Sequence, residues 1–188
     1  MGVITKLIFN KILHELFVWR LKIERPNIIF LGIDTMVLDN DGAKKREGSE
    51  ATYKRNKGFQ PLHICWGPFL IDVLFRKGSA HSNHGNEYTQ RVKSIISHIR
   101  KRYSEQAAII LCADSGFADQ NAYEYFEGEL KKHYITTSKI HADVKEYVGG
   151  IPAQMFNIFK KGKSEWGYVE FANIWEYILD LDKPDNVI

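Results

Sequence analysis

Two short, uninterrupted apolar runs limit the folds open to this chain more than any other feature. Asn27–Ile33 reads NIIFLGI and Ala107–Cys112 reads AAIILC. Neither run alternates apolar with polar residues, as a strand with one solvent-facing side does. Such runs are typical of strands buried on both faces, in the middle of a sheet that helices cover. They therefore predict an α/β domain with a mixed sheet.

The segments around these runs carry the signals of a hairpin, two helices and one more strand. Gly67-Pro68 separates two strand-like segments and predicts an antiparallel hairpin. Helical spacing of apolar residues, and then a further strand pattern, complete the order β, β-hairpin, α, β, α, β. The expected elements are strands at 27–33, 62–66, 69–75, 107–112 and 133–137, and helices at 87–103 and 121–130.

The first 22 residues predict an amphipathic helix that ends before Pro26. Its apolar residues at helical spacing are Leu7, Ile8, Ile12, Leu13, Leu16 and Phe17. Charged residues interrupt the segment and no small-residue cleavage site follows it, which argues against a signal peptide. We expect this helix to pack on the core or on a neighbour; binding to a membrane surface is the alternative.

Composition narrows the class of protein further. The sequence is 188 residues long, 44% apolar and 26% charged, which suits one globular domain with a sizeable core. No stretch approaches 18 uncharged apolar residues, so we expect no membrane-spanning helix. The two cysteines, Cys65 and Cys112, form no CxxC pair and lie in apolar runs. They predict reduced thiols and a cytoplasmic location.

Charge is distributed unevenly along the chain. The whole chain carries a formal net charge of only +3, but residues 44–102 hold thirteen basic residues against four acidic ones, a net charge of +9. Residues 164–188 hold six acids and one lysine, a net charge of −5. A basic segment beside carboxylates is consistent with a polyanionic substrate such as nucleic acid, and equally with a solvated surface.

An aspartate follows each of the two apolar runs. Asp34 comes directly after the first, and Asp114 comes after the second and Ala113. The carboxyl ends of strands form the edge of an α/β sheet where loops diverge and sites form. Two carboxylates side by side are costly unless a cation neutralises them, and Mg²⁺ prefers hard oxygen ligands. We therefore expect Asp34 and Asp114 to bind metal; for either one alone, a helix N-cap or turn is the alternative.

Four ordered motifs contain these two acids and the residues between them. They are Gly32-Ile33-Asp34-Thr35; Gly48 followed by Tyr53-Lys54, Lys57-Gly58-Phe59 and Pro61-Leu62; Phe75-Arg76-x-Gly78-Ser79; and Ala113-Asp114-Ser115-Gly116-Phe117. In this order the series resembles the DDE transposases of bacterial insertion sequences, group 1 class. The resemblance covers roughly Ile28–Tyr147.

The resemblance implies a fold and its division along the chain. The expected fold is a ribonuclease H-like mixed five-stranded sheet with flanking helices, plus part of an inserted β-rich region near the C-terminus. The implied divisions are an N-terminal helix at 1–26, a catalytic core at 27–147 and a partial insertion at 148–188. Such transposases are longer than this chain, so we expect a chain truncated at both ends.

The resemblance also implies an activity: metal-dependent DNA cleavage and strand transfer at the ends of the mobile element. Asp34 and Asp114 match the first two acidic ligands, with Mg²⁺ or Mn²⁺ as the cofactor and no organic cofactor. The partners implied are transposon-end and target DNA, with a homodimer as a further candidate and no membrane. The basic residues expected to contact DNA are Lys54, Arg55, Lys57, Arg76 and Lys77.

The third acid of the DDE set is not identified by the sequence. Glu165, Glu170 and Glu176 are the late glutamates, and no Tyr/Arg/Lys signature accompanies them. We expect the true third ligand to lie beyond the end of the chain, and isolated activity to be weak as a result. Two alternatives stay open: an inactive remnant that binds DNA or a partner chain, and a phosphatase that uses Asp39 and Asp41.

Overall fold

The computed structural model describes residues 3–42, 46–80, 87–137 and 142–168. The chain divides into two compact units, Met1–Lys139 and Ile140–Ile188. The predicted division at 1–26, 27–147 and 148–188 stays a prediction.

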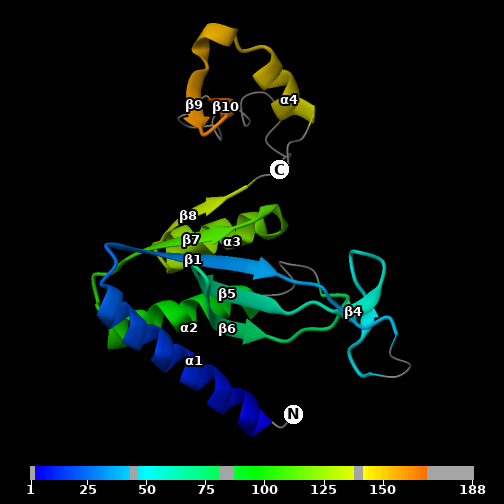
Figure 1. Cartoon of the computed structure of the whole chain (residues 1–188), viewed down its shortest axis with the longest axis vertical. Coiled ribbons are helices and arrows are strands. Elements are labelled where there is room, and N and C mark those ends of the chain that lie inside the picture. The colour runs from blue at the N-terminus through cyan, green and yellow to red at the C-terminus, as the bar shows by residue number, and fades with distance from the viewer. Residues whose placement is uncertain (1–2, 43–45, 81–86, 138–141, 169–188) are drawn as a thin grey trace. The chain divides into compact units, whose positions relative to one another are not determined.

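The first unit is built on a five-stranded mixed sheet. Its order is β6-β5-β1-β7-β8, with β1 central between β5 and β7 (Figure 1). β1 pairs antiparallel with β5 and parallel with β7, β5 and β6 form an antiparallel hairpin, and β8 is parallel to β7. The strands are β1 (Ile28–Thr35), β5 (Leu62–Trp66), β6 (Phe69–Leu74), β7 (Ala108–Ala113) and β8 (His133–Thr136). This topology confirms the predicted ribonuclease H-like sheet.

One face of the sheet packs into a single hydrophobic core. Alternate residues of the central strand, Ile29, Leu31 and Ile33, are at most 2% exposed, and they cluster with Val92 and Ile99 of a helix. After the N-terminal helix, the unit contains α2 (Glu87–Arg102) and α3 (Gln120–Glu124), the latter continued by a π-helical turn, η2 (Tyr125–Glu129).

The expectation that the first apolar run is buried on both faces is wrong for the described structure. Residues of β1 alternate between buried and exposed, with Ile28 41% and Phe30 45% exposed. The strand reads as apolar throughout, but only the side chains on one face reach the core, because side chains alternate across a sheet. Asp34 belongs to the exposed set.

The N-terminal helix forms as predicted, and only part of its predicted apolar set faces the core. α1 (Val3–Glu24) buries Phe17, Val18 and Leu21, each at most 5% exposed. Phe17 belongs to the predicted apolar set, but Ile12 and Leu16 of the same set are 52% and 55% exposed. The helix carries apolar residues on two sides, and spacing alone does not say which side meets the sheet.

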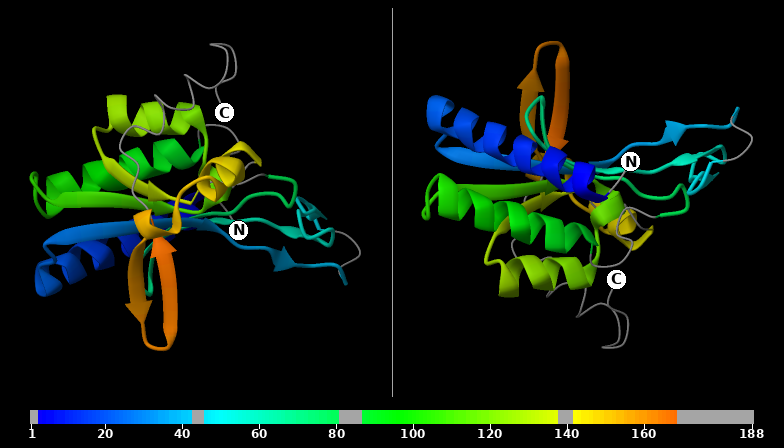
Figure 2. Two further views of the ribbon diagram at one scale, coloured as in Figure 1. Left: turned by 90° about the horizontal axis from the view of Figure 1, so that it is seen from above. Right: turned by 90° about the horizontal axis from the view of Figure 1, so that it is seen from below.

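A second, smaller sheet interrupts the chain between β1 and β5. Its three strands are β2 (Leu38–Asp39), β3 (Glu50–Ala51) and β4 (Lys57–Phe59), in the order β2-β4-β3. The chain enters it three residues after the end of β1, so it extends past the carboxyl end of that strand (Figures 1 and 2). We call it the small sheet below.

The second unit is described from Ala142 to Tyr168. It contains α4 (Ala142–Gly149), a 3₁₀ turn η3 (Ala153–Met155) and an antiparallel hairpin of β9 (Asn157–Lys161) and β10 (Ser164–Tyr168). Gly162 takes a φ of +61° in the hairpin turn, a conformation that glycine adopts without strain. The hairpin agrees with the β-rich segment predicted near the C-terminus. Among the described residues, no helix is long and apolar enough to cross a membrane.

Candidate active site

The strand register brings Asp34 and Asp114 to equivalent positions. β1 and β7 run parallel, and the last residues paired between them are Ile33 and Ala113. Asp34 and Asp114 each come one residue later, and Asp114 keeps an extended backbone at φ −83° and ψ 177°. Neighbouring strands lie about 4.8 Å apart and side chains alternate, so both carboxylates project from the same face. Both residues are exposed.

Backbone hydrogen bonds orient both carboxylates. Asp34 Oδ1 accepts from the Thr35 N–H at 2.6 Å, and Asp114 Oδ1 accepts from the Gly116 N–H at 2.9 Å. Asp114 thereby caps the 3₁₀ turn η1 (Ser115–Phe117), so its predicted alternative role as a cap is also real. Among the described residues, the second oxygen of each carboxylate accepts no hydrogen bond. One oxygen of each acid is left to act as a ligand.

The donors present fit a hard divalent cation. Two exposed carboxylates, each with one oxygen that accepts no hydrogen bond from the described part of the chain, match the way Mg²⁺ is bound through one or two carboxylates while it keeps several waters. Among the described residues, no group of three or more His, Cys, Asp or Glu side chains is arranged to hold a metal ion. Of the late glutamates, Glu170 and Glu176 lie outside the described residues, and the side chain of Glu165 is likewise not described.

Two side chains beside Asp34 were missed by sequence reasoning. His63 of β5 pairs directly with Asp34, and Cys65 pairs with Gly32, all on the exposed face. Both side chains are half-buried. Only the strand register places them beside Asp34, because 29 positions separate His63 from Asp34 along the chain. The neighbour of an acid at the end of a strand is set by the pairing of that strand with the next one, and it cannot be found from distances along the sequence.

The charge of Asp34 affects the pKa of the Cys65 thiol. Burial raises the pKa of Cys65, and the negative charge of Asp34 raises it further. Burial alone raises the pKa of Cys112. Because the thiolate is the reactive form, a raised pKa slows alkylation at neutral pH.

Replacing Asp34 with asparagine should therefore shift the pH–rate profile for alkylation of Cys65 to lower pH. The measurement is iodoacetamide labelling followed by mass spectrometry, in a Cys112→Ala background. Asp114→Asn, one strand farther away, is the matched control and should shift the profile less. Identical profiles for the parent and Asp34→Asn would contradict the placement of Asp34 beside Cys65.

Glycines lie where backbone segments of the small sheet come closest to one another. A Cβ on Gly58 would lie 2.3 Å from the Leu38 carbonyl oxygen, and one on Gly78 would lie 2.2 Å from that of Glu50. Both positions therefore exclude any side chain. Gly78 also donates its N–H to the Gly48 carbonyl at 3.2 Å. Motif glycines far apart in sequence thus meet in one small structure, which gives a physical reason for their spacing.

A tight loop at the tip of the β3–β4 hairpin presents basic and aromatic side chains. Thr52 Oγ1 donates to Asn56 Oδ1 at 2.5 Å and accepts from the Lys54 N–H at 3.3 Å, which closes the loop. Tyr53 is 63% exposed, and Lys54 Nζ lies 5.8 Å from the centre of its ring. Lys54, Arg55 and Lys57 are all exposed. This tip is an accessible, positively charged surface.

The other two basic residues predicted to contact DNA differ from each other. Lys77 is exposed and pairs with Glu50 at 3.2 Å. Arg76 is only 6% exposed, and its Nε donates to the Gln60 carbonyl at 3.2 Å. Burial lowers the pKa of Arg76. A phosphate has no open route to this guanidinium, so the DNA interface proposed below leaves Arg76 out.

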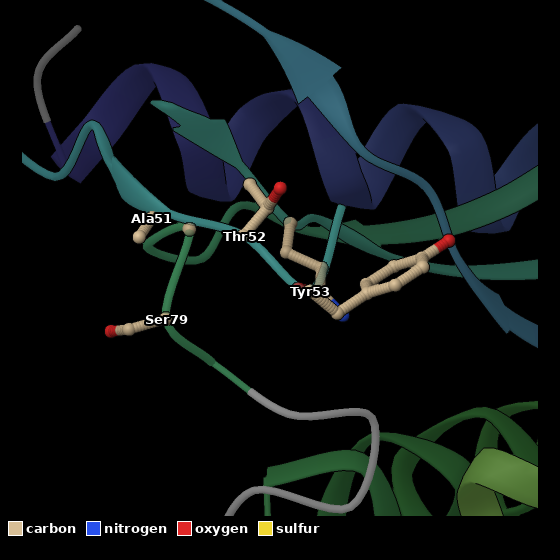
Figure 3. A pocket seen from close by; sticks show the side chains of 6 residues that line it. Ala51, Thr52, Tyr53 and Ser79 are labelled. Atoms are coloured by element: carbon tan, nitrogen blue, oxygen red, sulfur yellow. The ribbon is translucent and has the colours of Figure 1, made fainter. Parts of the chain in front are cut away.

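A hollow of about 280 Å³ opens beside the hairpin tip. Figure 3 shows Ser79 on one side of it and Tyr53 on the other. Its lining residues are Ala51, Thr52, Tyr53, Gln60, Gly78 and Ser79. The lining combines polar side chains with apolar surface from Ala51 and the Tyr53 ring.

The acids of the phosphatase alternative bind backbone groups in the small sheet. Asp39 Oδ1 accepts from the Asp41 N–H at 2.8 Å, and Asp41 Oδ1 accepts from the Lys57 N–H at 3.1 Å. The hydrogen bond from Asp41, with one from the Asn56 side chain, lowers the pKa of Asp39. Both carboxylates thus stabilise a turn, and this structural role accounts for the two aspartates without a catalytic function.

Comparison with known proteins gives a family for this arrangement. The sequence matches the model of the transposase DDE domain, group 1, over residues 9–176. This chain belongs to that family. The match extends over both units and includes Asp34, Asp114 and the whole small sheet. No curated protein matches the sequence.

Solved structures give only distant similarities. A piggyBac transposase synaptic complex with hairpin DNA aligns with a TM-score of 0.46 and 14% identity, covering 71% of this chain and 28% of that one. The catalytic domain of the Mos1 mariner transposase aligns with a TM-score of 0.42 and 11% identity, covering 76% and 65%. A Mos1 paired-end complex with the left transposon end gives 0.42 and 13%, covering 71% and 43%. The chain therefore spans less than two thirds of each of these relatives.

Proposed function

We propose that this chain is the catalytic core of an insertion-sequence transposase, which cleaves DNA and transfers strands at the ends of the element. The observation that carries the proposal is the register of β1 and β7, in which Asp34 and Asp114 occupy equivalent strand-end positions. The family match supports the same conclusion. The fold supplies a rigid support, because both acids are attached to central strands of the sheet.

In this proposal Asp34 and Asp114 hold Mg²⁺ or Mn²⁺. When bound, such ions activate a water or a 3′-hydroxyl and stabilise the leaving oxygen of a phosphodiester. The backbone N–H groups of Thr35 and Gly116 keep one oxygen of each carboxylate fixed, so that the other is oriented for the ion. The exposure of both acids leaves room for a DNA strand to reach them.

The small sheet holds DNA beside these acids. It extends from the carboxyl end of β1, the same end that carries Asp34. Its exposed cations, Lys54, Arg55, Lys57 and Lys77, can contact phosphates, and the Tyr53 ring offers a surface for base stacking. The bound DNA and the active acids then lie at the same end of the five-stranded sheet.

The double variant Lys54→Ala, Lys57→Ala should bind DNA more weakly and with a smaller salt dependence. Each lost phosphate contact removes about 0.9 from the slope of log affinity against log salt, so we expect a decrease of roughly 2. Fluorescence anisotropy with labelled duplex DNA at several salt concentrations measures both quantities. Lys11→Ala, an exposed lysine on α1, is the control. An unchanged slope in the double variant would remove the small sheet from the DNA interface.

Nicking of supercoiled plasmid DNA tests the activity itself. The proposal predicts relaxed product with Mn²⁺ and none with EDTA. DNA binding without any Mn²⁺-dependent nicking would favour the inactive remnant instead. Nicking that persists in EDTA would show that the cleavage does not come from a metal site.

A further inference from the structure

His63 on β5 is a half-buried polar side chain to which the metal proposal assigns no role. It pairs with Asp34 across β5 and β1. Side chains of directly paired residues project from the same face of a sheet, with Cβ atoms about 5 Å apart. Within the described part of the chain, the His63 imidazole forms no hydrogen bond or ion pair. Its ring nitrogens are therefore available to a ligand beside the acid.

His63 completes a row of three polar side chains at one end of the five-stranded sheet. β1 lies between β5 and β7, so the row runs from His63 through Asp34 to Asp114. On its other side His63 pairs with Val73, which has no polar group in its side chain. Ionised carboxylates only accept hydrogen bonds, whereas an imidazole carries an N–H. A phosphate bound at the two acids through a cation would thus find a hydrogen-bond donor at His63.

The row lies where the five-stranded sheet joins the small sheet (Figure 1). β5 begins three residues after the end of β4. The Met36 N–H, just after β1, donates to the Pro61 carbonyl, just before β5, at 3.2 Å. The two segments that connect the sheets are therefore held together beside His63. A DNA backbone that contacts both the cations of the small sheet and an ion at Asp34 would pass this junction.

We propose that His63 holds the DNA itself, with a ring N–H that donates to a non-bridging oxygen of the phosphate at the metal site. The inference rests on the proposed function, since it needs DNA and an ion at Asp34 and Asp114. A neutral imidazole keeps one N–H, so the contact needs no change in protonation. Because the acceptor is charged, such a bond is stronger than one between neutral groups. His63 then orients the phosphate and transfers no proton.

A role of His63 that acts through Asp34 is the nearest alternative. An imidazole N–H that donated to the carboxylate would orient the metal ligand, and its loss would weaken metal binding. Asp34 Oδ1 accepts from the Thr35 N–H, and the other oxygen accepts nothing from the described part of the chain. The two roles differ in one measurable quantity, which is the affinity for metal in the absence of DNA.

Calorimetric titration with Mn²⁺ in the absence of DNA separates these two roles. His63→Phe keeps an aromatic ring and removes both ring nitrogens. Removing a group that orients a metal ligand lowers metal affinity about 10- to 100-fold. We expect the dissociation constant of His63→Phe for Mn²⁺ to match that of the parent, because both carboxylates remain in place. A tenfold or larger loss of affinity, as expected on removing such a group, would overturn the proposal.

Nicking and DNA binding test the contact itself. His63→Phe should lower the Mn²⁺-dependent nicking rate at saturating protein, and the affinity for labelled duplex DNA with Mn²⁺ present, by about 10- to 100-fold each. Asparagine places an amide N–H near the position of Nδ1, and glutamine places one near that of Nε2. Either His63→Asn or His63→Gln should therefore recover most of the loss. The variant that does so identifies the donating nitrogen, and a purely structural role would not produce this recovery.

His133→Phe is the matched control. His133 is exposed on β8 and pairs with Ile110, whose own partner on β1 is the exposed Phe30. It therefore lies on the same face of the sheet as His63, but two strands away from β1. We expect this variant to match the parent in nicking, DNA affinity and Mn²⁺ affinity. Circular dichroism and melting temperature check that all variants are folded.

The failure of this inference differs from the failure of the proposed function. A His63→Phe variant that nicks and binds DNA as the parent does, or a loss that neither amide recovers, would overturn the role of His63 alone. A parent that neither binds Mn²⁺ nor nicks DNA would remove the proposed function and this inference with it. In a parent that binds Mn²⁺ without nicking, the DNA affinities of the same variants decide.

Discussion

Replacing Asp114 with asparagine is expected to lower Mn²⁺-dependent DNA nicking by roughly three orders of magnitude or more, because a site with one ligand lost no longer fixes the ion. Asparagine keeps an oxygen that can accept from the Gly116 N–H, so the 3₁₀ turn that Asp114 caps should persist. The loss should therefore appear in the nicking rate and not in the melting temperature. Asp34→Asn should have the same effect for the same reason.

Asp39→Asn provides the matched control for this loss. Asp39 is an exposed acid of the small sheet whose carboxylate accepts from the Asp41 N–H, and asparagine can keep that bond. We expect its nicking rate to stay within a few fold of the parent. If Asp39→Asn abolished phosphoester cleavage while Asp114→Asn did not, the active acids would lie in the small sheet and the phosphatase alternative would return.

Replacing Asp72 with asparagine is expected to lower the free energy of unfolding by about 3 kcal/mol, because it removes a buried carboxylate that contacts the half-buried His14 and Arg91. Asp72 on β6 is 1% exposed. Its Oδ2 lies 3.4 Å from both His14 Nε2 of α1 and Arg91 of α2. The carboxylate thus joins three elements of the core. Urea denaturation at pH 7 measures the effect.

The pH dependence of this effect has a definite sign. Burial opposes ionisation of Asp72, but contact with His14 and the charge of Arg91 outweigh it, so the pKa of Asp72 lies below its ordinary value. A lowered folded-state pKa contributes stability that is fully present above the unfolded value of about 3.9 and is lost as the pH falls through the folded value. The difference between parent and Asp72→Asn should therefore shrink below about pH 4.

An exposed ion pair serves as the control for Asp72. Glu50 accepts from Ser79 and pairs with Lys77 on the surface of the small sheet, and these contacts lower its pKa. Glu50→Gln should change the unfolding free energy little, because water screens exposed pairs. Equal effects of the two substitutions would show that Asp72 contributes no more than a surface acid does.

The sheet strands and the longer helices could be read from the sequence because their signals are local. The apolar runs at β1 and β7, the Gly67-Pro68 turn of the hairpin and the periodicity of α2 each depend on residues close together in the chain. These elements predict a mixed sheet, and the structure supplies the order of its strands, in which β1, β7 and β8 run parallel.

The small sheet could not be predicted in this way. Its strands are two or three residues long, too short for an alternating pattern to be recognised. They are held by backbone approaches at Gly58 and Gly78, between segments up to forty residues apart. Likewise the core side of α1 depends on its contacts with the sheet, so the apolar spacing predicted the helix but did not separate the buried Phe17 from the exposed Ile12 and Leu16.

The candidate site was predictable only in part. Asp34 and Asp114 stand out in the sequence because each follows a strand-like apolar run, and the register brings them together. His63 and Cys65 reach the same face only through antiparallel pairing, which the sequence does not specify residue by residue. The burial of Arg76 also depends on tertiary packing, since in sequence it looks like its exposed neighbour Lys77.

Calorimetric titration of the folded protein with Mn²⁺ tests the central claim that Asp34 and Asp114 form one metal site. The parent, Asp34→Asn, Asp114→Asn and the double variant are compared at one pH and salt concentration. The geometry predicts that the parent binds Mn²⁺ and that each single variant loses this binding as completely as the double variant does. Binding in both single variants equal to that of the parent would contradict the site.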